Sequence, residues 1–131
     1  RRDESLHDPA RRLLDEVGLG DRVGTLAASL SHGEQRQLEI AMALAGDPRL
    51  LLLDEPMAGM GVEESQRMIG FLRALKQKHA MLLIEHDMDA VFQLADRITV
   101  LVYGRAIASG TPDEIRTNPD VRQAYLGDEM A

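Results

Sequence analysis

The spacing of hydrophobic positions predicts helices and strands that alternate along this chain. Apolar residues recur at helical spacing over residues 9–17, 32–45 and 63–78, whereas residues 50–54 and 80–85 are short apolar segments that each end in a carboxylate. A short run that is apolar on both faces is typical of a strand buried in a parallel sheet. We therefore expect a layered α/β domain in which one helix connects two parallel strands.

Capping residues mark where several of these helices begin. Ser31 is followed three residues later by Glu34, which is a capping box, and Gly46 and Pro48 end the same helix. Further helix starts are predicted at Asp8 (before Pro9), Asp87, Thr111 (with Glu114) and Asn118 (before Pro119). Residues 97–103 and 105–109 flank Gly104 and predict a hairpin ahead of the last two helices.

Composition limits the classes of function. The 131 residues suffice for one modest core, and the net charge of −7 argues against a protein that binds nucleic acid through its phosphates. The chain contains no cysteine, and its apolar runs are too short to span a bilayer. Because the sequence opens with Arg1-Arg2-Asp3-Glu4, without an initiator Met and directly before a helical pattern, we treat it as a fragment.

Two carboxylates follow the first predicted strand. Asp54 and Glu55 end an apolar run, and the carboxyl edge of a parallel sheet is where α/β folds bind ligands. We expect Asp54 to hold Mg²⁺ and Glu55 to act as the general base on an attacking water. His86 follows the second strand, where it could contact a terminal phosphate.

The start of the helix at Ser31 has a different chemistry. Free N–H groups and a hydroxyl at the positive end of a helix bind phosphate oxygens, and Gly33 lets the backbone approach closely. Each feature also has an ordinary explanation when taken alone: a helix cap, a solvated turn or a surface histidine. Their joint occurrence in this order favours nucleotide chemistry.

These segments together resemble ATP-binding-cassette (ABC) ATPases. Residues 30–35 (Leu-Ser-His-Gly-Glu-Gln) are similar to the signature motif, residues 50–55 to the Walker B strand, and His86 to the switch histidine. Residues 38–41, 84–88 and 118–127 most resemble the ATPases of branched-chain amino-acid importers. ATPases for lipopolysaccharide export and urea import are similar at the same places.

The resemblance implies the C-terminal part of one P-loop NTPase domain, without its phosphate-loop strand, over residues 1–131. Residues 1–47 would end the helical subdomain and carry the signature helix. Residues 48–131 would supply parallel strands with flanking helices, a C-terminal hairpin and short helices. Because the phosphate-loop strand belongs between the His86 strand and residues 98–101, its absence predicts either unpaired strand edges or a collapsed sheet.

The resemblance also implies a mechanism in which two subunits pair head to tail around ATP and Mg²⁺. Asp54, Glu55 and His86 would act on a subunit's own nucleotide, while four signature residues would bind the partner's: Ser31, His32, Gly33 and Glu34. A loop would contact the partner subunit through Ala58, Gly59, Met60 and Gly61. Further partners would be transmembrane permease subunits and, indirectly, a substrate-binding protein, on the cytoplasmic face of the membrane.

Three positions depart from the family pattern. His32 replaces a glycine, Glu34 replaces a glutamine and faces its own helix start as a cap, and Gly61 replaces an Asp or Asn. Three functions stay open at this stage: the ATPase of an importer, a catalytically inert truncated chain, and an ATPase of the DNA-repair type. A basic groove or a long coiled coil would favour the third, and the sequence contains neither.

Overall fold

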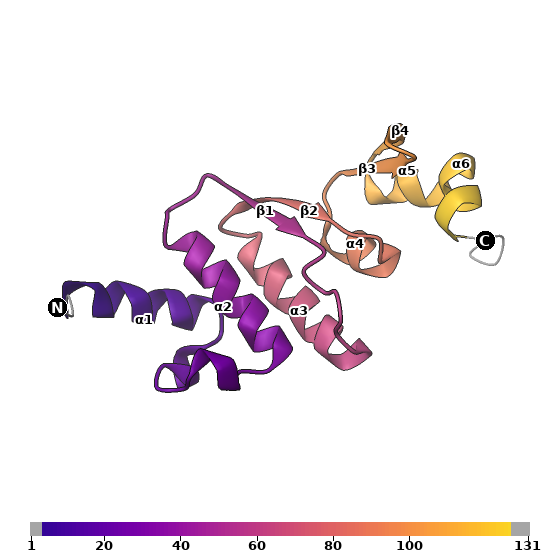
Figure 1. The fold of residues 1–131 in the computed structure, drawn as a ribbon. Helices are drawn as coiled ribbons and strands as arrows, with labels where there is room; N and C mark the ends of the chain where they lie inside the picture. The colour runs from indigo at the N-terminus through magenta and orange to yellow at the C-terminus, as the bar shows by residue number, and fades with distance from the viewer. Residues whose placement is uncertain (1–3, 127–131) are drawn as a thin grey trace. The chain divides into compact units, whose positions relative to one another are not determined.

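The computed structural model describes residues 4–126, and it divides into two compact units (Figure 1). Unit 1 comprises Arg1–Ile84 and unit 2 comprises Glu85–Ala131. Residues 1–3 and 127–131 lie outside the described residues, and with them the start of the chain and the Gly127 end of the family-like tail. The subdivision expected at residue 47 stays a prediction.

Over residues 4–84, unit 1 contains three α-helices and two strands, joined in part by short 3-10 helices. In chain order the elements are η1 (Glu4–Leu6), α1 (His7–Glu16), η2 (Gly20–Arg22), η3 (Ala27–Ser29), α2 (His32–Leu44), β1 (Leu50–Asp54), α3 (Val62–Leu75) and β2 (Ala80–Ile84). Helix α1 begins earlier than predicted. Its N-cap is Leu6, which makes no side-chain cap bond, so the predicted cap at Asp8 is wrong. The preceding turn η1 leads directly into the helix.

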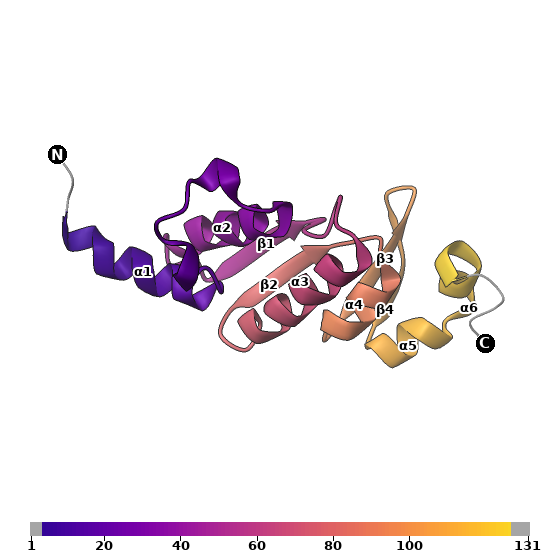
Figure 2. The same cartoon turned by 90° about the horizontal axis from the view of Figure 1, so that it is seen from below.

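The predicted β–α–β arrangement is confirmed. Strands β1 and β2 pair in parallel, with Leu50 opposite Ala80 and Asp54 opposite Ile84, and α3 connects them. Helix α3 overlaps the helical pattern predicted over residues 63–78, and it buries four apolar side chains: Met68, Ile69, Leu72 and Leu75. Helices α2 and α3 lie on the same side of the strand pair (Figures 1 and 2).

The other face of this strand pair is apolar and exposed. Side chains two residues apart share a face of a strand, which groups Leu50 and Leu52 with Leu82 and Ile84. Their exposed fractions are 51%, 69%, 57% and 56%. On the opposite face Leu51 is only 3% exposed. The prediction that both faces are buried is therefore wrong in this structure, because helices cover one face only.

Unit 2 is built around an antiparallel hairpin. Its elements are α4 (Met88–Leu94), β3 (Ile98–Val102), β4 (Arg105–Gly110), α5 (Pro112–Thr117), α6 (Pro119–Val121) and a π-helical turn, η4 (Arg122–Leu126). Strands β3 and β4 pair in a sheet of their own, so β2 and β3 are not paired with each other. The choice between the two expected outcomes, unpaired strand edges or a collapsed sheet, stays a prediction.

The core of unit 2 joins the hairpin to the last helices. Its buried members are Ile98, Val100, Ile115 and Val121. The predicted caps at Asp87, Thr111 and Asn118 all form, and Thr111 makes a full capping box with Glu114. Within residues 4–126, no helix is both long enough and apolar enough to cross a lipid bilayer.

The contrast between two leucines of unit 1 tests this description of the core. Leu72 is fully buried, so Leu72→Ala should lower the free energy of unfolding by about 2–5 kcal/mol. Leu82→Ala removes the same atoms from an exposed position and should change it by less than about 0.5 kcal/mol. Urea unfolding followed by circular dichroism measures both changes. Equal losses of unfolding free energy would contradict the burial of Leu72 and the exposure of Leu82.

Candidate functional site

The two predicted catalytic carboxylates lie where β1 ends. Asp54 is the last residue of β1 and pairs with Ile84 at the end of β2. The backbone N–H of Glu55 donates a hydrogen bond to the carbonyl of Ile84, with 2.8 Å between the nitrogen and the oxygen. Asp54 is exposed and Glu55 is half-buried. The parallel pairing therefore holds both residues at the carboxyl edge, as predicted.

The backbone of Glu55 is held in an unfavourable conformation. Its φ of 45° lies in the left-handed region, which costs a residue with a side chain about 1–3 kcal/mol. The hydrogen bond to Ile84 fixes its N–H, and its carbonyl accepts a bond from the N–H of Ala58 at 3.0 Å. Strain of this kind concentrates at functional sites, so it supports a role for Glu55 beyond packing.

The loop after Glu55 is anchored by buried residues and presents exposed ones. Pro56 and Met57 are buried, whereas three of the four predicted dimer-contact residues are exposed and Met60 is half-buried. Nε2 of His32 lies 3.2 Å from the carbonyl oxygen of Ala58. Because a carbonyl only accepts, this nitrogen must carry the hydrogen. The loop is thus bonded directly to the first turn of α2.

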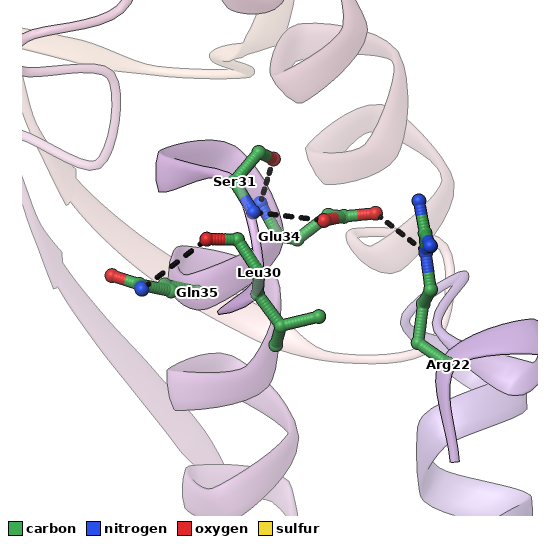
Figure 3. A network of polar contacts seen from close by, with 5 residues as sticks. All are labelled: Arg22, Leu30, Ser31, Glu34 and Gln35. Atoms are coloured by element: carbon green, nitrogen blue, oxygen red, sulfur yellow. Dashed lines mark hydrogen bonds and ion pairs between the residues drawn. The ribbon is translucent and has the colours of Figure 1, made fainter. Parts of the chain in front are cut away.

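The start of α2 is a complete capping box, as predicted (Figure 3). The N–H of Glu34 donates to Oγ of Ser31 at 3.2 Å, and the N–H of Ser31 donates to Oε2 of Glu34 at 2.9 Å. Figure 3 also shows Arg22 reaching the same carboxylate, with its Nε donating to Oε1 at 3.0 Å. The Glu34 side chain therefore faces its own helix start.

These contacts change the acidity of Glu34. The hydrogen bond from the Ser31 backbone is the largest cause and, together with the positive charge of Arg22, lowers the pKa of Glu34 below its ordinary value of 4.5. The ionised form is therefore the one that the fold favours.

The N–H of Gly33, unlike those of Ser31 and Glu34, is bonded to a residue of another helix. The N–H of Gly33 donates to Oε1 of Glu64, on the first turn of α3, at 2.7 Å. Gly33 is buried, whereas Ser31 and His32 are exposed. This contact was not predicted, since Glu64 lies 31 residues away along the chain and belongs to a helix face that the pattern marks only as polar.

An open cavity of about 380 Å³ adjoins the helix start. Its lining combines two arginines and two glutamates with residues of the signature segment: Arg22, Ser31, Gly33, Glu34, Gln37, Glu64, Arg67 and Met68. All eight residues belong to unit 1. Two guanidinium groups and a hydroxyl are donors that an anionic group can use, and the two carboxylates balance the charge of the arginines.

The remaining predicted site residue, His86, belongs to unit 2. It is exposed and lies between the end of β2 and Asp87, whose side chain caps α4 through the N–H of Ala90 at 3.2 Å. The convergence of His86 with the two carboxylates of unit 1 stays a prediction. Along the chain, only Glu85 separates it from Ile84, the partner of Asp54.

The donor set for a metal ion is small. Within residues 4–126, no group of three or more His, Cys, Asp or Glu side chains could hold a metal ion. Mg²⁺ is commonly bound by one or two carboxylates together with substrate phosphates and water. The exposed carboxylate of Asp54 at the strand end fits that smaller requirement.

Comparison with known proteins identifies the family. The ABC transporter family model matches residues 2–58, and the model for the branched-chain amino acid ATP-binding cassette transporter matches residues 107–131. The chain belongs to the ABC transporter ATP-binding family. The matched residues include the signature segment and the Walker B strand with its two carboxylates.

Curated relatives agree with this assignment. The chain is 43% identical over 123 residues to the high-affinity branched-chain amino acid transport ATP-binding protein LivG of Salmonella typhimurium, covering 92% of this chain and 48% of that protein. It is 43% identical over 121 residues to BraF of Pseudomonas aeruginosa, a protein of the same description, covering 91% and 48%. It therefore spans about half the length of these relatives.

A solved structure shows the same fold. The ADP conformation of MJ1267, an ATP-binding cassette of an ABC transporter, matches with a TM-score of 0.84 and 28% identity, covering 98% of this chain and 52% of that one. The ABC ATPase fold predicted from the sequence is thus confirmed.

The lowered pKa of Glu34 generates a prediction about pH. A carboxylate whose pKa is depressed by folding stabilises the fold fully above its unfolded value of 4.5, and this contribution is lost as the pH falls through the folded pKa. Glu34→Gln should therefore be less stable than the parent at neutral pH and equal to it in strong acid. Urea unfolding at both pH values measures the difference.

A control separates the contributions of Ser31 and Arg22 to the lowered pKa of Glu34. In Arg22→Met the folded pKa, followed by carboxyl ¹³C NMR, should rise but stay below 4.5, because the Ser31 N–H bond remains. A midpoint at or above 4.5 in the parent chain would contradict the capping geometry.

Proposed function

We propose that this chain is the part of an ABC transporter ATPase that supplies the general base and the signature helix, in a system that imports branched-chain amino acids. The observation that carries the proposal is the placement of Asp54 and Glu55 at the carboxyl edge of a parallel strand pair, with Glu55 held in a strained conformation. The identity to LivG and BraF supports the choice of solute class.

In this proposal three side chains act on the nucleotide held by their own subunit. Asp54 holds Mg²⁺, which supplies charge neutralisation at the phosphate oxygens. Glu55 orients the attacking water and accepts its proton, and the strained backbone fixes the direction in which its side chain leaves the strand. His86 donates a hydrogen bond to the terminal phosphate and holds the water in line.

A second set of residues acts on the nucleotide held by the partner subunit. Ser31, His32, Gly33 and Glu34 form the start of α2, where N–H groups, a hydroxyl and the positive end of the helix favour phosphate oxygens. The exposed loop residues Ala58, Gly59 and Gly61, with Met60, contact the partner. ATP therefore lies between two subunits, and its hydrolysis separates them.

The exposed face of β1 and β2 supports the view that this chain is completed by further polypeptide. Parallel sheets are found with both faces covered, whereas Leu50, Leu52, Leu82 and Ile84 here form an apolar exposed face. The relatives are about twice as long. In the proposal the missing half carries the phosphate loop, and the completed ATPase binds permease subunits at the cytoplasmic face of the membrane.

The lipopolysaccharide-export alternative has one observation in its favour. The chain is 42% identical over 122 residues to the lipopolysaccharide export system ATP-binding protein LptB of Acidithiobacillus ferridurans. The matching C-terminal family model at residues 107–131 is the observation that favours the importer instead.

Hydrolysis by a completed domain tests the proposal. The isolated chain should release no phosphate from ATP above background. A chimera that places the unmatched N-terminal half of the LivG relative before this chain should hydrolyse ATP. In that chimera, Glu55→Gln should lower the rate about 10²–10⁴-fold while nucleotide binding persists, because only proton transfer is removed.

The matched control for Glu55→Gln is Glu63→Gln, which removes the same charge from an exposed position on α3. It should leave turnover near the parental rate. Unaltered turnover in the Glu55→Gln chimera would refute the role of Glu55 as the general base. Hydrolysis by the isolated chain that Glu55→Gln abolishes would refute the proposal that the chain needs a further half to be active.

A further inference from the structure

The amide of Gly33 is already bonded to a carboxylate from another element. Oε1 of Glu64 accepts its hydrogen bond at 2.7 Å, and a Cβ atom built on Gly33 would lie 2.5 Å from the same oxygen. A side chain at this position would therefore push the Glu64 carboxylate away from the Gly33 amide. The contact is specific to Glu64, since the adjacent Glu63 is exposed.

The two bonds of the capping box at this helix start are local. Ser31 and Glu34 satisfy each other within the capping box and need no second element. Only the Gly33 bond, among these three, depends on α3. It is also the bond that brings a negative charge from elsewhere in the chain to the positive end of α2.

A carboxylate oxygen and a phosphate oxygen make the same kind of hydrogen bond to an N–H group. They cannot both occupy the single hydrogen of Gly33. We propose that Glu64 is an internal competitor for the phosphate site of the signature helix, and that an arriving phosphate must displace it. This inference rests on the proposed function, in which the start of α2 receives a nucleotide phosphate.

Two arginines lie near Gly33, where they can pair with a displaced Glu64 carboxylate or with a bound phosphate. Arg67 lies three residues after Glu64 on α3, a spacing at which a displaced carboxylate and a guanidinium are neighbours. Arg67 and Arg22 both line the cavity beside Gly33. The released side chain therefore gains a cationic partner while the cavity accepts the anion.

The exchange links the signature helix to the loop after Glu55. Glu64 belongs to the first turn of α3, directly after the loop of residues 55–61, and His32 bonds the same loop through the carbonyl of Ala58. Release of Glu64 breaks the hydrogen bond from Gly33 to α3 and leaves the hydrogen bond from His32 to Ala58 in place. Phosphate arrival at α2 is thereby communicated to the segment that leads back to Asp54 and Glu55.

The test uses the intact 131-residue chain, labelled with ¹⁵N, and inorganic pyrophosphate as the probe at constant ionic strength. The Gly33 amide shift gives the apparent dissociation constant. Because the competing contact is a charge-assisted hydrogen bond, Glu64→Ala should bind about tenfold more tightly than the parent chain, and Glu64→Gln should be intermediate. The matched control Glu63→Gln should stay within about twofold of the parent, because Glu63 is exposed.

A measurement on the unmodified chain covers the case in which the variants fold poorly. The side-chain carboxyl ¹³C signal of Glu64 should move during the titration with the same midpoint as the Gly33 amide. A Glu64 signal that stays fixed while Gly33 responds, or equal affinities in all four chains, would overturn the inference and leave the proposed phosphate site standing. If pyrophosphate shifts neither Ser31, Gly33 nor Glu34 in any chain, the proposed role of the helix start fails as well.

Discussion

The arrangement of this site depends on one constraint, the parallel in-register pairing of β1 with β2. The pairing places Asp54 opposite Ile84 and fixes the N–H of Glu55 through a ladder bond beyond the last strand residue. Since parallel strands need a crossover, the same pairing requires α3 to run back along the helical side of the strands. The first turn of α3 is what meets α2 at Gly33. One pairing thus positions both the carboxylate edge and the signature helix.

The start of α2 carries two carboxylates that differ in origin and consequence. Glu34 belongs to the helix itself, where it closes the capping box and pairs with Arg22. It therefore stabilises the start of α2 through contacts that do not involve α3. Glu64 reaches the helix from α3 and occupies the N–H of Gly33. A glutamate in place of the family's glutamine at residue 34 is therefore compatible with phosphate binding, because its charge is committed to its own helix start.

Local features of the fold were predictable from the sequence, and distant contacts were not. The capping box at Ser31, the buried face of α3 and the hairpin around Gly104 follow from residue types a few positions apart. Bonds such as Gly33 to Glu64 and His32 to Ala58 join residues 31 and 26 positions apart, which periodicity does not encode. The exposed face of β1 was missed because an apolar run signals burial, whereas periodicity does not say which faces of a strand other elements cover.

The most direct measurement is the hydrogen-bond coupling across the end of the strand pair. NMR of the ¹³C,¹⁵N-labelled chain detects scalar coupling between an amide nitrogen and the carbonyl carbon that accepts its hydrogen bond. We expect a coupling from the nitrogen of Glu55 to the carbonyl of Ile84, together with slow exchange of the Glu55 amide. A coupling displaced to a neighbouring carbonyl, or a freely exchanging Glu55 amide, would contradict the register on which the site depends.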